Sequence, residues 1–119
     1  MPVSRGAVIL ADLPFSDASG SKVRPALVVQ CDTNNQRLDD VIVALITRNT
    51  RRAALEVTQL LIDVATPEGQ QTGLLHTSAV KCEHLITIHQ KLIQRTAGSL
   101  SATLMRQIDA CLKASLDLP

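Results

Sequence analysis

Short runs of Val, Ile, Leu and Ala recur along most of this chain, and no helix-period segment separates them. Each run is bounded by Gly, Pro, Asn, Asp or Ser, which is typical of β-strands and the turns between them. The predicted strands are residues 7–13, 25–30, 40–47, 54–62 and 78–88. Strands that follow one another without intervening helices favour an antiparallel, barrel-like sheet.

The second predicted strand begins with Pro25, at a position where a ladder can do without the missing N–H. The run that follows it is continuously apolar, which predicts burial on both faces of the sheet. Two polar segments, 31–40 and 66–73, are rich in Asn and Asp or contain Pro and Gly. Both are predicted to be turns.

The last part of the chain changes its period. Ser101 is a suitable N-cap for a helix. The apolar residues that recur behind it at helical spacing are Leu104, Met105, Ile108, Cys111, Leu112 and Leu116. We therefore expect a terminal amphipathic helix that covers the sheet.

Length and composition indicate a single domain over residues 1–119. With 45% hydrophobic residues, a core can form without metal or disulfide. The three cysteines are widely spaced and form no C-x-x-C, which favours a reducing compartment and no zinc site. No run is long enough for a signal peptide or a membrane span, so a soluble, cytoplasmic protein without a membrane partner is expected.

Several common catalytic patterns are missing: there is no P-loop, no G-x-G-x-x-G, no H-E-x-x-H and no G-x-S-x-G. His84 and His89 are five residues apart on a predicted strand, so they should face opposite sides and chelate no metal together. A surface or half-buried position is the favoured interpretation for both. His76, which follows Gly73 near a strand start, is kept as a candidate site residue.

Basic residues gather at two strand ends. Lys22 and Arg24 flank the entry to the second strand, and Arg48, Arg51 and Arg52 follow the third. Neighbouring strands would bring both groups to one rim, forming a local site for an anion on a chain of net charge +1. A solvated charge run is the alternative interpretation.

Arg24 is the more specific signal because Pro25 restricts the residue before it to extended backbone. A guanidinium held in one direction suits phosphate, because its planar fork matches two oxygens at once. The alternative is an arginine that forms a salt bridge at a strand end.

Three segments together resemble the MazF/PemK toxins of bacterial toxin–antitoxin modules: R-G-A-V-I-L-A-D-L-P-F-S, G-S-K-V-R-P-A-L-V-V-Q and D-V-I-V-A-L-I-T. The resemblance continues through residues 78–88 to the closing helix. It implies a mainly β fold, a small SH3-like antiparallel barrel of the PemK/CcdB kind with a C-terminal helix packed on it, assembled as a homodimer.

The resemblance also implies an activity. Such toxins are metal-independent, cofactor-free endoribonucleases that cut single-stranded mRNA at short sequences and arrest growth. The neighbouring 2′-hydroxyl attacks, leaving a 2′,3′-cyclic phosphate and a 5′-hydroxyl, and a cognate antitoxin protein blocks the site.

By position, the catalytic arginine of the family falls on Arg24 and its threonine on Thr47. Arg24 would stabilise the negative charge that develops on phosphorus. The resemblance also assigns proton transfer to this arginine. A guanidinium with a pKa above about 12 is a poor general base, however, so His76 is kept as an alternative candidate for that role. The residues implied to hold RNA are Ser19, Gly20, Ser21, Lys22, Arg48, Asn49, Arg51, Arg52, His76 and Ser78.

Two segments depart from better-known members. The loop before the arginine, residues 16–22, is S-D-A-S-G-S-K without the Glu of G-S-E-Q, and Ser78-Ala79 stand where an acidic residue and Gln are common. A different recognised sequence is the favoured interpretation, and a degenerate relative is an alternative. Because Phe15 is the single aromatic residue among Phe, Tyr and Trp, stacking of bases on aromatic side chains cannot be the main source of affinity for RNA.

A second class of function shares this barrel, because the CcdB gyrase poisons bind a protein and catalyse nothing. Those proteins end in Trp-Gly-Ile, whereas this chain ends S-L-D-L-P and contains no Trp. The gyrase-binding alternative therefore carries little weight.

Overall fold

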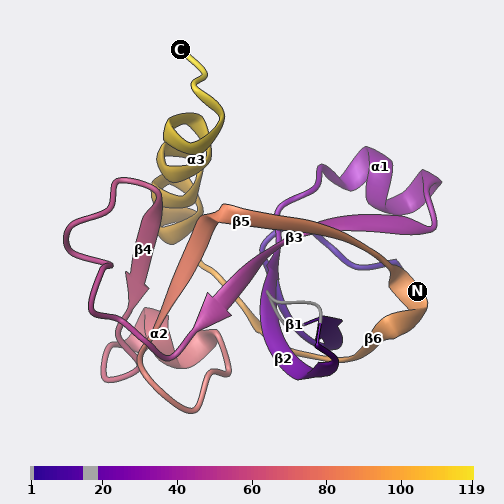
Figure 1. The fold of residues 1–119 in the computed structure, drawn as a ribbon, viewed down its shortest axis with the longest axis horizontal. Coiled ribbons are helices and arrows are strands. Elements are labelled where there is room, and N and C mark those ends of the chain that lie inside the picture. Colours follow the sequence, from indigo (N-terminus) through magenta and orange to yellow (C-terminus); the bar gives the residue numbers. More distant parts are fainter. Residues whose placement is uncertain (1, 15–18) are drawn as a thin grey trace.

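The computed structural model describes residues 2–14 and 19–119. Their strands form one six-stranded antiparallel sheet in the order β4-β5-β3-β2-β1-β6, curled into a half-barrel (Figure 1). The strands are β1 (Ala7–Pro14), β2 (Ser21–Val28), β3 (Asp40–Thr47), β4 (Gln59–Ile62), β5 (Ser78–His89) and β6 (Ile93–Ser99). The helices are α1 (Asp32–Arg37), α2 (Pro67–Gln71), α3 (Ala102–Leu116) and a 3₁₀ turn at Gln90–Leu92.

The expected antiparallel, barrel-like sheet is confirmed. β3 has the predicted bounds, and β1 and β5 each extend one residue beyond theirs. These three segments are rich in Val, Ile and Leu, and side chains of this kind pack well on a pleated, buried surface.

The start of β2 was predicted wrongly. The strand begins at Ser21 and not at Pro25, which lies inside it opposite Leu10 of β1. Pairing with β3 is confined to Ala26–Val28, beyond the proline. Pro25 therefore sits where β2 is bonded on one side only, and its missing N–H removes no bond from the β2–β3 ladder.

The two predicted turns contain short helices. α1 starts at Asp32, whose carboxylate accepts the backbone N–H of Arg5 at 2.7 Å. α2 starts behind Thr66, whose hydroxyl accepts the N–H of Gly69 at 2.9 Å, with Pro67 in the first turn. α2 carries an N-cap and a proline in its first turn, and α1 has no side-chain cap but carries an acidic residue in its first turn. The turn interpretation left these signals unused.

Two strand predictions also need correction. The predicted strand 54–62 shrinks to β4, because its first half turns instead of pairing. β6 was not predicted, because its sequence I-Q-R-T-A-G-S is polar and lacks a clear alternation. It pairs only with β1, at the edge of the sheet, where a strand needs little apolar surface.

The centre of the sheet is buried on both faces, as the sequence predicted for β2. Ala26 and Val28 belong to the core inside the curl, whereas Leu27 belongs to a second core on the other face. Each fully buried Val or Leu side chain contributes about 1.5–3 kcal/mol to folding.

The predicted terminal helix is confirmed, and it covers the second core. Ile108 and Cys111 of α3 are buried there, and α3 packs against β4 and β5 (Figure 1). The hydroxyl of Ser101 accepts the N–H of Leu104 at 3.1 Å, which confirms the predicted N-cap. Of the helices that the described residues form, none has both the length and the apolar content that crossing a membrane requires.

Candidate active site

Arg24 and Thr47 lie side by side at the point where β2 and β3 separate. The last pair of that ladder is Ala26 with Leu45, so continuing the register by two residues sets Arg24 opposite Thr47. Residues two apart on a strand share a face, which directs both side chains to the side of the first core. Both side chains are half-buried, and both line the same two neighbouring cavities.

The larger of these cavities, about 330 Å³, opens at the ends of β2 and β3. Lys22 and Arg48 line it together with Arg24, so of the second predicted basic group only Arg48 meets the first group in this cavity. Thr47 and the buried Ser78 complete its polar lining. Three cations around one cavity favour an anionic group inside it.

Two features of the backbone restrict Arg24. It pairs with Ala11 of β1, and Pro25 restricts its conformation. The ion pairs among the described residues are Arg5–Asp109 and Arg52–Glu56, and neither includes Arg24. The alternative of a salt-bridged strand-end arginine is therefore not what the described part of the chain contains.

The hydroxyl of Thr47 has a defined orientation. Its oxygen accepts the backbone N–H of Asn49 at 3.1 Å, and the Asn49 side chain accepts that of Arg51 at 3.2 Å. A hydroxyl that accepts in this way keeps its own proton for donation. The turn after β3 thus presents Thr47 as a hydrogen-bond donor beside a guanidinium.

The second shared cavity, about 90 Å³, contains two residues that sequence reasoning missed. Lys81 and His84 of β5 line it with Arg24 and Thr47. Lys81 pairs with Leu45, which brings it to the same face as Thr47. No local spacing in the sequence links these residues to Arg24, because three strands must be aligned before they meet.

His84 is half-buried, and its surroundings disfavour the imidazolium. Burial lowers the pKa of this side chain, and the positive charges of Lys81 and Arg24 lower it further, while the Glu83 carboxylate acts in the opposite direction. The net shift is downward, so the ring is mainly neutral at pH 7.

A third cavity of about 160 Å³ adjoins these at Thr47 and Lys81, and Asn49 and Arg52 line it. Gln59 also lines it and donates to one carboxylate oxygen of Glu83 at 2.7 Å, and Thr58 donates to the other at 3.2 Å. Burial raises the pKa of Glu83, but these hydrogen bonds, a backbone hydrogen bond and the charge of Lys81 together outweigh it, and the net pKa is lowered. Glu83 is therefore an ionised group with both oxygens engaged.

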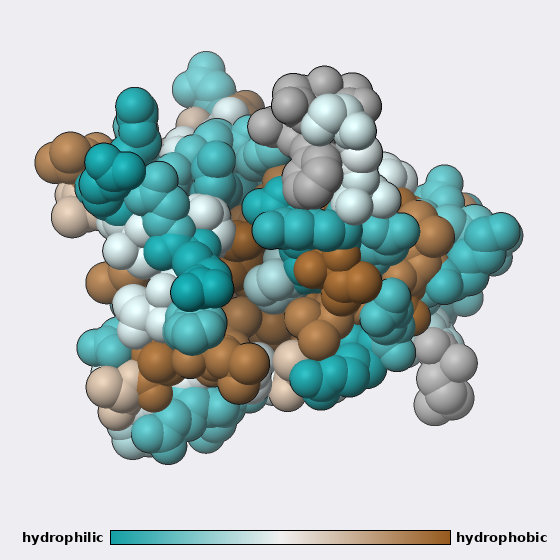
Figure 2. Space-filling model, turned by 60° about the horizontal axis from the view of Figure 1, so that its bottom comes forward, coloured by the Kyte–Doolittle hydropathy of each residue, from teal (hydrophilic) through white to brown (hydrophobic). Residues whose placement is uncertain are grey.

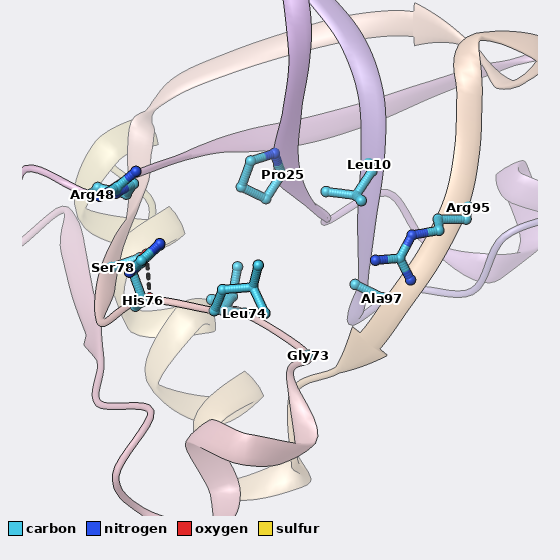
Figure 3. Close-up of a pocket in the computed structure, with 10 residues that line it drawn as sticks. Leu10, Pro25, Arg48, Gly73, Leu74, His76, Ser78, Arg95 and Ala97 are labelled. Atoms are coloured by element: carbon cyan, nitrogen blue, oxygen red, sulfur yellow. Dashed lines mark hydrogen bonds between the residues drawn. The ribbon is translucent and has the colours of Figure 1, made fainter.

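His76 lies in a different, more apolar pocket of about 170 Å³ (Figure 3). Leu10, Pro25, Leu74 and Ala97 form its apolar part. Arg48, Ser78 and Arg95 lie at its edges, and the Ser78 hydroxyl donates to the His76 carbonyl at 2.7 Å. Figure 2 shows apolar residues gathered in the hollowed middle of the face that forms the bottom of Figure 1, with hydrophilic residues around them.

The remaining predicted residues are less closely gathered. Ser19, Gly20 and Ser21 are exposed and line none of these cavities. The first part of the loop 16–22, and Phe15, lie outside the described residues. Arg51 is exposed and does not line the third cavity, although its sequence neighbour Arg52 does. Across 2–14 and 19–119, no group of three or more His, Cys, Asp or Glu side chains is arranged to hold a metal ion.

Known proteins resemble this chain over nearly its whole length. The family described as "PemK-like, MazF-like toxin of type II toxin-antitoxin system" matches residues 4–116. Endoribonuclease MazF2 of Mycobacterium bovis is 35% identical over 120 residues, covering 99% of this chain and 100% of that protein. Endoribonuclease MazF6 of Mycobacterium tuberculosis has the same identity and coverage.

Solved structures share the fold. A mycobacterial endoribonuclease in complex with its cognate antitoxin superposes with a TM-score of 0.79 at 21% identity, covering 98% of this chain and 97% of the other. Mycobacterium tuberculosis toxin MazF-mt6 gives 0.76 at 26%, covering 95% and 98%. A MazE–MazF structure from Deinococcus radiodurans gives 0.73 at 15%, with full coverage of both chains.

Proposed function

This chain belongs to the PemK-like, MazF-like toxin family of type II toxin–antitoxin systems, and from that premise we propose a reaction and a site for it. It is an endoribonuclease of this family, as its full-length relatives are named. These relatives favour catalysis over the gyrase-binding alternative. What remains to be assigned is the chemistry and the residues that perform it.

The proposed reaction is metal-independent cleavage of single-stranded mRNA. The 2′-hydroxyl attacks the adjacent phosphorus and the 5′-oxygen leaves, giving a 2′,3′-cyclic phosphate and a 5′-hydroxyl. Arg24 neutralises the extra negative charge that the phosphoryl oxygens acquire in the transition state. Thr47 donates a hydrogen bond to one of these oxygens, with its hydroxyl held by the turn at Asn49.

The observation that carries this proposal is the convergence of Arg24 and Thr47 in two shared cavities. The scissile phosphate is placed between them. The flanking nucleotides extend along the adjoining cavities, past Lys22 and Arg48 on one side and past Asn49 and Arg52 on the other. Lengths of backbone on both sides of the scissile phosphate thereby meet positive charge.

The proposed partners follow from the family. A cognate antitoxin blocks the cavities around Arg24, in a cytoplasmic module that arrests growth when the toxin is free. A homodimer is the proposed assembly. The exposed apolar side chains of Leu55, Val57 and Leu75, which are 82%, 76% and 87% exposed, support burial of further surface by partners.

The decisive experiment is cleavage of a long single-stranded RNA in EDTA, with fragment ends mapped. We expect discrete cuts with cyclic-phosphate ends from the wild type and none from Arg24→Ala. The matched control is Arg106→Ala, which alters an exposed arginine on α3 that donates to the Thr103 hydroxyl at 3.2 Å. A folded Arg24→Ala protein with wild-type activity, or a wild type that cuts only when a divalent metal is restored, would contradict the proposal.

A further inference from the structure

The proposed reaction lacks a group that removes the proton from the attacking 2′-hydroxyl. In the cavity where Arg24 and Thr47 meet, Lys81 and Arg24 are cations and Thr47 is a neutral hydroxyl. None of these is an effective base near pH 7. The nearby carboxylate of Glu83 accepts hydrogen bonds on both of its oxygens.

One titratable group lining this cavity is left, and it is an imidazole. We propose that His84, and not His76, is the general base of the reaction, an assignment that rests on the proposed function. His84 lines the cavity together with both residues proposed to contact the phosphate. His76 lines the apolar pocket, which includes neither Arg24 nor Thr47.

An irregularity in β5 turns His84 toward this cavity. On β3 the neighbours Ala44 and Leu45 pair with Leu85 and Lys81, so the intervening residues Cys82–His84 have no partner on β3. The segment is anchored on its other side, because the N–H of Cys82 donates to the Thr58 carbonyl at 2.9 Å. Bulges of this kind re-aim side chains and are over-represented beside active sites.

The charges that face His84 suit a base. Lys81 and Glu83 precede it on β5, and Arg24 lies near it on β2. The residues of β3 in the cavity, Leu45 and Thr47, carry no charge. Burial and the two cations lower the pKa of His84 more than Glu83 raises it. The ring is therefore unprotonated and ready to accept a proton at the pH of a cytoplasm.

The step balances without any co-reactant other than water. A ring nitrogen of His84 takes the 2′-hydroxyl proton as the 2′-oxygen forms its bond to phosphorus. The P–O5′ bond breaks with its electron pair going to O5′, which takes a proton from solvent. The imidazolium then returns its proton to solvent, so that the enzyme regains its starting state.

The test is the pH dependence of single-turnover cleavage by wild type, His84→Gln and His84→Ala. We expect both variants to lose about 10²- to 10⁴-fold in rate, the usual contribution of general acid–base catalysis. The wild-type rate should decrease at pH values below the pKa of His84. This decrease, the acid limb of the pH profile, should be absent from both variants. Added imidazole should restore part of the rate of His84→Ala, because the removed ring enlarges a cavity of about 90 Å³.

Two comparisons make the result specific. His89→Gln alters a histidine of the same strand whose Nδ1 accepts the Lys91 N–H at 3.0 Å, and it should keep the wild-type rate and acid limb. Circular dichroism and RNA binding separate a misfolded variant from a catalytic one, and imidazole rescue occurs only in a folded protein.

Different results would contradict the assignment to His84 and the proposed function on which it rests. A folded His84→Gln enzyme with the wild-type rate and acid limb overturns the assignment, as does loss of the limb in His76→Gln alone. If the wild type makes no metal-free cuts, the proposed function itself has failed.

Discussion

At the scale of single residues, substitutions of Thr47 can separate the contribution of its hydrogen bonds from that of its packing. Its hydroxyl accepts the Asn49 N–H at 3.1 Å and keeps a proton to donate toward the cavity shared with Arg24. Serine preserves both bonds and loses one methyl group. Valine preserves the shape and removes both bonds.

We therefore expect Thr47→Ser to cleave RNA at a rate close to the wild type and Thr47→Val to lose about 10²- to 10³-fold, as removal of one transition-state donor typically does. The measurement is the rate constant of cleavage under single-turnover conditions, with thermal unfolding of both variants as the folding control. Equal rates for Ser and Val would show that the hydroxyl has no part in the reaction.

The residues of the site differ in how far sequence alone could find them. Arg24 and Thr47 stand beside recognisable signals, a proline and a strand end, and a family pattern points to both. His84 and Lys81 have no such signal, because their place depends on an irregular register between β3 and β5. Strand parity placed His84 and His89 on opposite faces, but it does not say which face meets Arg24.

At the scale of elements, prediction worked where burial dictates the sequence. β3 lies in the middle of the sheet, so nearly every position is apolar and its bounds are sharp. β6 lies at the edge with mostly exposed or half-buried residues, so its sequence carries little strand signal. What holds β6 is its pairing with β1 and its close approach to α2, and both are long-range.

The close approach of β6 to α2 can be tested by a substitution in β6. A Cβ built on Gly98 of β6 would lie 2.2 Å from the carbonyl oxygen of Gln71 at the end of α2. The clash is with backbone, which cannot move without shifting an element. We expect Gly98→Ala to lower the free energy of unfolding by about 1–3 kcal/mol or more, the cost of overpacking.

The measurement is urea unfolding, and Ser99→Ala, at an exposed neighbouring position, is the matched control with little expected effect. A Gly98→Ala protein as stable as the wild type would mean that the backbones of β6 and α2 lie further apart than this distance implies.

At the scale of the whole molecule, the charge is balanced but unevenly placed. The net charge is +1, so no overall field attracts RNA. Yet the connected cavities around Thr47 are lined by Lys22, Arg24, Arg48, Arg52 and Lys81. Binding to a phosphate backbone should therefore depend on these few local contacts, and each should act through release of counterions.

This distribution predicts a modest salt dependence that single substitutions alter. For single-stranded RNA, the logarithm of the binding constant should fall against the logarithm of salt concentration with a slope of about −0.7 per phosphate contact. Removing one contact with Arg52→Gln should make the slope less steep by about 0.7. Arg52 is suitable because it is 78% exposed and its ion pair with Glu56 is long, at 3.8 Å, so little structure depends on it.

Binding is measured by fluorescence anisotropy with an uncleavable RNA whose 2′-hydroxyls are methylated, over a range of potassium chloride concentrations. Lys113→Gln is the matched control, because Lys113 lies in the last turn of α3 and lines neither of the two described cavities that Arg24 lines. It should leave the slope unchanged. If both substitutions change the slope equally, RNA responds to total charge rather than to the cavities. The path proposed for RNA beside Thr47 would then be wrong, even with Arg24 essential for cleavage.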